Sequence, residues 1–181
     1  TKIIKKNNFI KILNNEKNIN TLAPYKLVKT MRAGVLVLGS LLTKYGKAKV
    51  SLPGGCAIGS RPVDLHLFAL KKLGAKIKIK DGYILAEAKK GLTGAIINFP
   101  SISVGATENA LLAASKAKGK TILNNCAIEP EIKDLIIFLR KLGLNIIFKG
   151  RTIIVNESKI NNSKIIWILT ISTMIAIKAI N

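Results

Sequence analysis

The stretch from Ser51 to Leu65 holds the residue types best suited to chemistry, because a thiol, a guanidinium and three glycines stand between an expected strand and an expected helix. The glycines free the backbone of bulk, and Pro62 suits the first turn of a helix. Cys56 and Arg61 therefore belong to a loop that leads into a helix N-terminus. Unpaired N–H groups and the positive end of a helix dipole favour anions there, and with Arg61 they would lower the pKa of a thiol. The loop is suited to a phosphate beside a reactive cysteine, but a buried, inert Cys56 fits its residue type equally well.

An internal repeat provides a comparison for this loop. Residues 41–87 align with residues 111–157, with an offset of 70 positions at the cysteine (126 − 56). The matching positions are Cys56-Ala57-Ile58 with Cys126-Ala127-Ile128, Asp64 with Asp134, and Leu73-Gly74 with Leu142-Gly143. Each copy predicts helix, strand, loop, helix, strand, turn and strand, so one supersecondary unit occurs at least twice. The second copy lacks the loop glycines and has Glu131 in place of Arg61, which makes Cys126 the expected scaffold cysteine.

Three segments carry a resemblance to a known family. They are the segment APYKLVKTMRA at residues 23–33, the string LPGGCAIGSRPVDLH at residues 52–66, and SVGATEN at residues 103–109. Together they closely resemble the UDP-N-acetylglucosamine 1-carboxyvinyltransferases, a family of enolpyruvyl transferases. The similarity runs from about Thr21 to about Val155, and the loop cysteine separates this family from its shikimate-pathway relative.

The resemblance implies a reaction. An enolpyruvyl group would pass from phosphoenolpyruvate to the 3-hydroxyl of UDP-N-acetylglucosamine with release of phosphate, the first committed step of peptidoglycan synthesis. Cys56 would be the general acid near the enolpyruvyl methylene, able to form a covalent adduct with it, and the target of fosfomycin. The substrate-binding residues implied are Arg32, Arg61, Pro62, Val63, Asp64, Leu65, Ser101, Ile102, Ser103 and Val104. No cofactor and no metal ion are implied.

Some of these assignments have alternatives. The arginines would hold anionic groups, since guanidinium pairs with phosphate in a bidentate fork. Ser101 stands where the family often has lysine. From residue types alone, helix capping is the favoured role of Ser103 or Thr107.

The resemblance also implies a fold. The class is α/β (α+β), an inside-out α/β barrel domain built from repeated units of about 70 residues, with the active site in a cleft between two such domains. We expect residues 1–158 to form part of one domain, with an incomplete unit at the N-terminus, and residues 159–181 to be a divergent, truncated or frame-shifted tail. The missing second domain would be the partner, so little turnover is expected of this chain alone. The alternative is a non-catalytic nucleotide-sugar-binding or structural relic.

Local patterns predict the elements that position these residues. Expected are helices over Pro24–Met31, Ala33–Tyr45 (closed by Gly46), Pro62–Leu73 and Ala106–Lys116, a hairpin from Lys76 to Ala86 with an Asp81-Gly82 turn, and a strand over Ala95–Phe99.

Composition argues against a nucleic-acid-binding, membrane-spanning or metal-binding protein. The net charge is +21, but lysines supply most of it, aromatic residues make up 5% of the chain, and no basic-aromatic interleaving suggests nucleic-acid binding. The apolar run from Ile165 to Ile177 is shorter than the roughly 20 residues that span a bilayer. The single histidine, His66, is expected to orient or pack and not to bind metal. Two unpaired cysteines and no recognisable signal peptide favour the cytoplasm.

Overall fold

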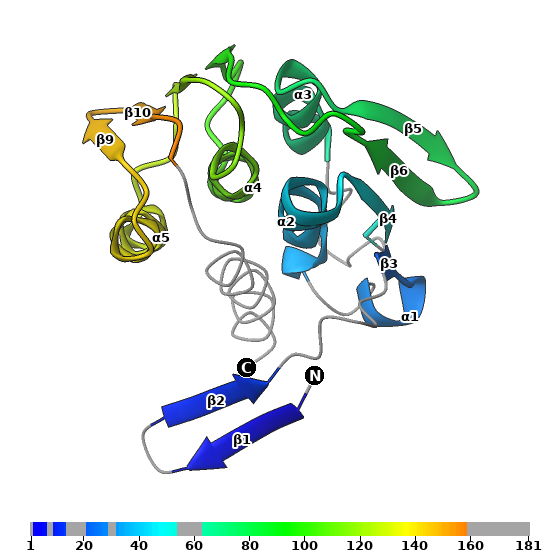
Figure 1. Cartoon of the computed structure of the whole chain (residues 1–181). Coiled ribbons are helices and arrows are strands. Elements are labelled where there is room, and N and C mark those ends of the chain that lie inside the picture. Colours follow the sequence, from blue (N-terminus) through cyan, green and yellow to red (C-terminus); the bar gives the residue numbers. More distant parts are fainter. Residues whose placement is uncertain (1, 7–8, 14–20, 29–31, 54–62, 159–181) are drawn as a thin grey trace.

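The computed structural model describes residues 2–6, 9–13, 21–28, 32–53 and 63–158 (Figure 1). Of both N-terminal strands, and of Leu27, Arg32 and Ala33, only the backbone is described. The predictions for Cys56, Arg61 and Pro62, and for the tail from residue 159 to 181, lie outside the described residues.

Two successive units follow an N-terminal antiparallel hairpin of β1 (Lys2–Lys6) and β2 (Phe9–Leu13). The first unit consists of β3 (Leu22–Ala23), α1 (Tyr25–Val28), the 3-10 helix η2 (Arg32–Leu36), α2 (Val37–Tyr45), β4 (Lys47–Ser51), α3 (Asp64–Lys72), β5 (Lys76–Lys80) and β6 (Tyr83–Glu87). The second consists of β7 (Ile96–Asn98), α4 (Val104–Ala114), β8 (Thr121–Asn124), α5 (Pro130–Lys141), β9 (Ile146–Lys149) and β10 (Thr152–Val155).

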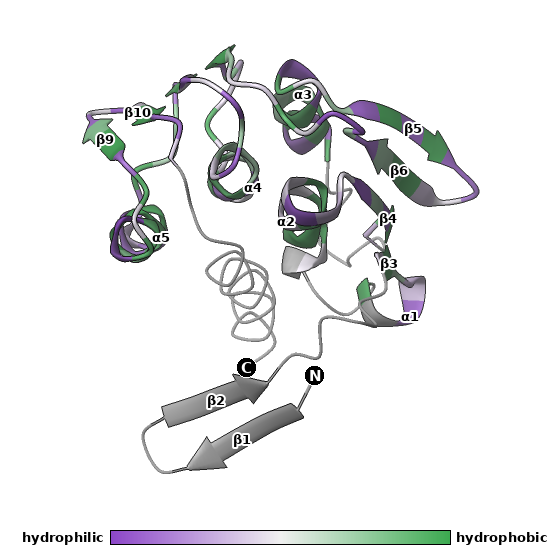
Figure 2. Cartoon of the chain, in the orientation of Figure 1, coloured by the Kyte–Doolittle hydropathy of each residue, from purple (hydrophilic) through white to green (hydrophobic). Residues whose placement is uncertain are grey.

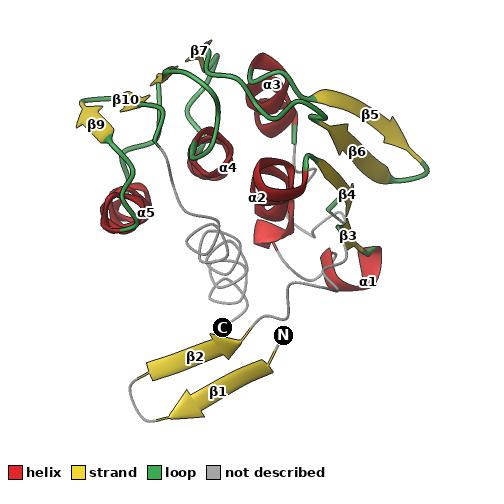
Figure 3. Ribbon diagram, in the orientation of Figure 1, coloured by secondary structure: helices red, strands yellow, loops and turns green. Residues whose placement is uncertain are grey.

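The two units have the same sheet topology, which confirms the predicted repeat (Figure 3). The first sheet has the order β3-β4-β6-β5 and the second β7-β8-β10-β9. In each, the opening pair is parallel and the other pairs are antiparallel. A parallel pair needs a crossover connection, and the helical segment before β4 and α4 before β8 supply it.

The hairpins close as their sequences predict. Lys80 pairs with Tyr83 across Asp81 and Gly82, whose φ angles are 51° and 73°. Positive φ at both central residues is the pattern of a type I′ turn, which matches the twist of the flanking strands. Alternate residues of β6, Ile84 and Ala86, are buried, so one face of this sheet packs on the core and the other faces solvent.

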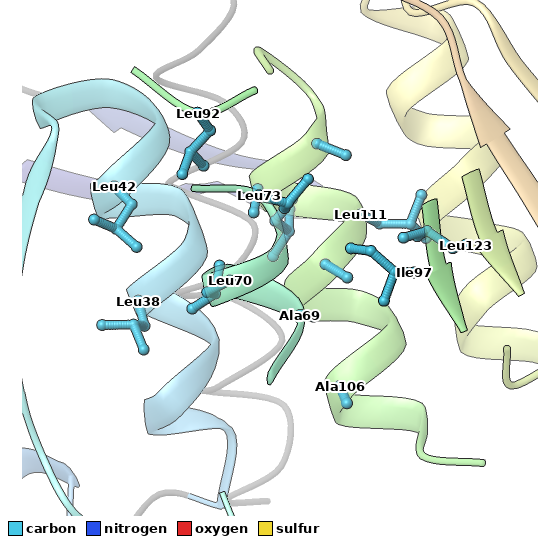
Figure 4. Packing of buried hydrophobic residues seen from close by; sticks show 14 of the residues in the cluster. Leu38, Leu42, Ala69, Leu70, Leu73, Leu92, Ile97, Ala106, Leu111 and Leu123 are labelled. Atoms are coloured by element: carbon cyan, nitrogen blue, oxygen red, sulfur yellow. The ribbon is translucent and has the colours of Figure 1, made fainter. Parts of the chain in front are cut away.

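The helices meet in the interior, and the sheets lie outside them (Figure 1). Leu38 and Leu42 from α2 lie in one buried cluster with Leu70 and Leu73 from the α3 segment and Leu111 from α4 (Figure 4). The colouring of α5 shows apolar and polar stretches on one helix, whereas α4 is buried from Ala106 to Ala114 (Figure 2). A helix enclosed on all sides is the centre of its packing layer, so α4 is the central element of the described chain.

The helix starts differ from the sequence prediction: α1 begins at Tyr25 and not at Pro24, and α3 begins at Asp64, after Val63, and not at Pro62. α4 begins at Val104 and not at Ala106, because Ser103 is extended (φ −148°) and its Oγ accepts from Ala106 N at 3.3 Å, as an N-cap does. The expected helix from Ala33 is a 3-10 turn up to Leu36 and α-helical only from Val37. The tighter turn brings Gly34 against Val28, where an added Cβ would lie 2.8 Å from Val28 Cγ1.

Helices α2 and α4 pack through equivalent positions of the repeat. Gly39 and Asn109 are 70 residues apart and are joined by a 2.9 Å hydrogen bond from Gly39 N to Asn109 Oδ1. One turn later, Thr43 Oγ1 lies 3.3 Å from the carbonyl oxygens of Leu112 and Ala113. A Cβ at position 39 would overlap Asn109 Oδ1 and lie 2.7 Å from Asn109 O, so only glycine allows this approach.

We therefore expect Gly39→Ala to destabilise the chain by about 1–3 kcal/mol, the usual cost of overpacking a core. Helix propensity alone predicts the opposite sign, because alanine is favoured over glycine by about 0.5–1 kcal/mol within a helix. Urea unfolding followed by circular dichroism measures the difference. A variant more stable than the parent would show that the α2–α4 contact is loose.

Candidate functional site

The candidate site lies where parallel strands end and helices begin. β4 leads into α3, β7 into α4 and β8 into α5. The predicted substrate-binding segments occupy two of these junctions: Val63–Leu65 opens α3 and Ser101–Val104 opens α4. Ligands of open α/β sheets commonly bind at the carboxyl ends of parallel strands, where helix N-termini converge. Next to these segments, a Cβ added at Gly105 would lie 3.2 Å from His66 Cε1, so the structure brings together two segments that are far apart in the sequence.

The predicted residues differ in how far their side chains can reach a ligand. Val63 is buried in the core, so it offers a ligand only its backbone. Leu65 is half-buried against the same core, whereas Asp64 is exposed. Ser101 and Ile102 are exposed, and Ser103 and Val104 are half-buried.

The first turn of α4 keeps two backbone donors available. Thr107 N donates to Ser103 O, and Ser103 Oγ accepts from Ala106 N, so the capping role is confirmed for Ser103. Within the described part of the chain, no acceptor meets the N–H of Val104 or Gly105. Unpaired amides at a helix start attract negative charge, so this turn is suited to an anion.

Thr107 links the same turn to the neighbouring junction. Its Oγ1 donates to Ser103 O at 2.8 Å and accepts from Ala127 N at 3.1 Å. The loop after β8 is thereby fixed to the start of α4. Thr107 is a structural connector, because its hydroxyl both donates and accepts a hydrogen bond within the protein.

A buried imidazole and a buried amide connect α2, α3 and α4. His66, 8% exposed on α3, lies with its Nδ1 3.1 Å from Asn109 Nδ2. Asn109 Nδ2 also donates to Val35 O at 3.3 Å, and Asn109 Oδ1 accepts from Gly39 N. Burial lowers the pKa of His66 from 6.5 to about 4, so the ring is neutral at pH 7. His66 orients and packs as predicted, whereas the sequence did not single out Asn109.

A second buried polar group on α4 faces α5. Glu108 is 5% exposed, and no cation of the described chain pairs with it. Burial, together with the charge of Glu131, raises its pKa from 4.5 to about 7. Near neutral pH, Glu108 is therefore divided between its charged and uncharged forms.

Cys126 has the properties of a scaffold cysteine. Its side chain is fully buried, and burial raises its pKa to about 12. Its backbone N–H donates to Arg151 O at 2.9 Å, and Arg151 Nη1 donates to Cys126 O at 3.0 Å. The thiolate is the reactive form of cysteine, so the burial of Cys126 supports the scaffold role predicted for it.

The described residues offer neither a metal site nor a membrane-spanning helix. They contain no group of three or more His, Cys, Asp and Glu side chains arranged to hold a metal ion. They also contain no helix with the length and apolar character needed to cross a bilayer.

The shifted pKa values of His66 and Glu108 give opposite dependences of folding stability on pH. Between pH 4 and 6.5 the unfolded chain binds a proton at His66 that the folded chain does not, so stability falls as pH falls. Between pH 4.5 and 7 the folded chain binds a proton at Glu108 that the unfolded chain does not, so stability falls as pH rises.

Glu108→Gln should therefore leave the His66 dependence unopposed. Relative to the parent, we expect its free energy of unfolding to gain up to about 1.4 kcal/mol per pH unit from pH 4.5 to 6.5. Urea midpoints at pH 5 and 6.5 for both proteins test this, with Glu87→Gln on the exposed hairpin as the control. Parallel pH profiles for parent and Glu108→Gln would contradict the buried, raised-pKa state of Glu108.

Comparison with known proteins agrees with this arrangement. The family described as EPSP synthase (3-phosphoshikimate 1-carboxyvinyltransferase) matches residues 1–168. The UDP-N-acetylglucosamine 1-carboxyvinyltransferase of Pelagibacter ubique is 61% identical over 162 residues, which cover 90% of this chain and 39% of that protein. The enzyme of the same name from Rickettsia prowazekii is 53% identical over 159 residues, 87% of this chain and 38% of that protein. The chain thus spans about two fifths of the length of these relatives.

Solved structures show the same fold. The enolpyruvyl transferase NikO from Streptomyces tendae superposes with a TM-score of 0.65 at 23% identity, over 77% of this chain and 33% of that one. EPSP synthase from Acinetobacter baumannii gives a TM-score of 0.57 at 21% identity, over 71% of this chain and 29% of that one. The described units therefore form part of an enolpyruvyl transferase domain, as the sequence predicted. With its strand-to-helix junctions and its family match over most of its length, the chain belongs to the EPSP synthase family and resembles the UDP-N-acetylglucosamine 1-carboxyvinyltransferases within it.

Proposed function

We propose that this chain is part of an enzyme that transfers the enolpyruvyl group of phosphoenolpyruvate to the 3-hydroxyl of UDP-N-acetylglucosamine, in peptidoglycan synthesis. The observation that supports it most is the pair of adjacent helix starts at Val63–Leu65 and Ser101–Val104. These segments carry the family motifs, and the second leads into the N–H groups of Val104 and Gly105, which have no acceptor among the described residues. The names of the relatives supply the substrate class.

In this proposal the junctions form one wall of a nucleotide-sugar site. The N–H groups of Val104 and Gly105 attract the diphosphate through the dipole of α4. Arg32 and Arg61 add charge that pairs with phosphate oxygens. Asp64 is the exposed acceptor of the wall, able to bind a hydroxyl or an amide N–H of the ligand.

Cys56 is the proposed general acid. Protonation of the methylene carbon of phosphoenolpyruvate makes the adjacent carbon electrophilic, and the 3-hydroxyl of the sugar attacks there with loss of its proton. Expulsion of phosphate and loss of a proton from the methyl group restore the double bond. A thiol beside an arginine and a helix N-terminus is acidic enough to exchange a proton near neutral pH.

We expect little or no turnover from this chain alone. It covers about two fifths of the relatives' length, and catalysis needs both substrates aligned and shielded from water. Binding of the nucleotide sugar without turnover is the activity expected of the isolated chain. The alternative to this proposal is a non-catalytic nucleotide-sugar-binding or structural relic of the same fold.

The first test is binding. Calorimetry should detect weak binding of UDP-N-acetylglucosamine to the parent, and Arg61→Ala should weaken it about tenfold or more, as expected for a lost charge-assisted hydrogen bond. Lys71→Ala removes the same charge from an exposed position at the far end of α3 and should bind like the parent. Equal affinities for the parent and Arg61→Ala would show that Arg61 does not contribute to binding.

The second test compares the two cysteines. Brief treatment of the folded chain with a neutral alkylating reagent should label Cys56 well before Cys126, because burial keeps Cys126 protonated and covered. Peptide mass spectrometry locates the label, and the same treatment in denaturant should label both residues. Equal labelling in the folded chain, or faster labelling of Cys126, would contradict the proposed catalytic role of Cys56.

A further inference from the structure

We propose that the outward face of the second sheet is a surface through which two copies of this chain associate, sheet against sheet. Four isoleucines lie in a line across this face, one on each strand. The strand register pairs Ile96 with Ile122, Ile122 with Ile154, and Ile154 with Ile147. These four residues form the isoleucine row, which crosses the full width of the sheet from β7 to β9.

The isoleucine row points away from the helices. Side chains alternate between the two faces of a sheet, and the neighbours of the row on three strands, Ile97, Leu123 and Ile153, are fully buried in the core. At the two edges of the sheet, Ile96 is 64% exposed and Ile147 is 50% exposed. The middle pair of the row is half-buried between the flanking strands. Single exposed apolar residues are ordinary, whereas a contiguous apolar strip indicates an interaction surface.

The first sheet provides an internal comparison for this row. Its equivalent row also passes through the third residue of the strand after the hairpin turn, and the register makes it Leu22, Lys49, Leu85 and Lys78. Every second position of that row is a lysine, whereas the second sheet has isoleucine throughout. Both sheets belong to one chain, so a general richness in lysine and isoleucine does not account for the difference.

The charges of the two faces favour a second copy as the partner of the isoleucine row. The outward positions of β4, β5 and β6 carry five lysines and one glutamate, namely Lys47, Lys49, Lys76, Lys78, Lys80 and Glu87. Those of the second sheet carry one charge, that of Lys149. At a net charge of +21 two copies repel each other in most orientations, and of the two sheets the second lets them approach with less repulsion. An anionic partner would bind the first sheet instead.

The polar side chains beside the isoleucine row are hydrogen-bonded to one another. Asn124 Nδ2 donates to Asn98 Oδ1 at 2.8 Å, and Thr152 Oγ1 donates to Asn124 Oδ1 at 3.0 Å. These three residues form the polar row. Covering a polar group costs free energy unless the group keeps a hydrogen bond. The polar row keeps its bonds when another sheet covers it, so this face can lose its water at a lower cost.

A two-fold axis parallel to the strands makes the contact self-complementary, as in most homodimers. It places β7 of one protomer over β9 of its partner, and β8 over β10, at the usual distance of about 10 Å between packed sheets. The isoleucine row then faces the isoleucine row, and the polar row faces the polar row. Lys149 of one protomer faces Asn98 of its partner, so the two lysines lie at opposite edges of the contact.

The size of the face sets the strength of the contact. Four strands about 4.8 Å apart, each with about four residues of 3.3 Å, make a face of roughly 250 Å². A standard interface covers about 800 Å² on each partner. We therefore expect a reversible dimer with a dissociation constant of about 0.1–1 mM, and not a permanent one.

Sedimentation equilibrium of the full chain measures this association. The average mass should rise with concentration between about 10 μM and about 1 mM, from that of the single chain toward that of the dimer. It should rise more steeply in about 0.5 M salt than in about 0.05 M salt, because screening weakens the repulsion between two basic copies and leaves the apolar contact. An association in which anions bridge lysines would show the opposite salt dependence.

Paired substitutions locate the contact. Ile122→Lys combined with Ile147→Lys gives the second sheet the lysine pattern that the first sheet already carries, and this variant should stay monomeric. Ile122→Thr combined with Ile147→Thr removes apolar contact without adding charge and keeps strand-forming residues, so it should weaken association about tenfold or more.

The control adds the same charge outside the row. Ile79→Lys combined with Ile137→Lys changes isoleucines that are 57% and 50% exposed on β5 and α5, and it should associate like the parent. Circular dichroism and thermal unfolding show whether each variant is folded, and the threonine pair tests the contact if the lysine pair does not fold.

Three results would overturn the inference. The first is a parent that stays monomeric at about 1 mM in about 0.5 M salt. The second is a folded threonine pair that associates as strongly as the parent, because another surface then joins the copies. The third is equal loss of association in the lysine pair and in the control, which would assign the loss to added charge and not to the isoleucine row.

Discussion

One buried amide sets the arrangement of the helices that face the site. The side chain of Asn109 is fully enclosed, and its hydrogen bonds reach Gly39 on α2, Val35 on η2 and His66 on α3. An unsatisfied buried polar group costs about 1–3 kcal/mol, so an alternative packing of these helices must find it other partners. The close approach at Gly39 leaves room for no side chain there. Together these two constraints fix one unit against the other.

The repeat explains how one fold can carry the predicted Cys56 loop in the first unit and a scaffold cysteine, Cys126, at the equivalent place in the second. Both units place a helix start after a parallel strand, a position that favours negative charge. In the second unit Cys126 is buried with its pKa raised, and an apolar Ile136 occupies the position equivalent to His66. The two units thus share a fold and differ in a few side chains at equivalent positions. This agrees with the general rule that function depends on the residues of a site and not on the fold.

The sequence predicted what depends on local patterns and missed what depends on tertiary neighbours. The Asp81-Gly82 turn and the buried Cys126 follow from turn chemistry and from the repeat. Burial of Glu108 and Asn109 on α4 was not predicted, because two adjacent polar residues in an apolar helix usually indicate a solvent-exposed side of that helix. Their roles arise from α5 and α2, which are distant in the sequence. The segment with Cys56 and Arg61 lies outside the described residues, so its geometry remains a prediction.

The central helix has a polar end and an apolar end, and the polar end lies beside the site. Successive residues of an α-helix point about 100° apart, so three consecutive residues can address different neighbours. Thr107 fixes the loop after β8, Glu108 faces the N-terminal end of α5, and Asn109 joins α2 and α3. Residues 110–114 are Ala and Leu only, so their side chains provide packing alone. A helix enclosed on every side can thus form hydrogen bonds and electrostatic contacts with several neighbouring elements only where its residues are polar. In α4 these polar residues are in the first turns, next to the proposed ligand site.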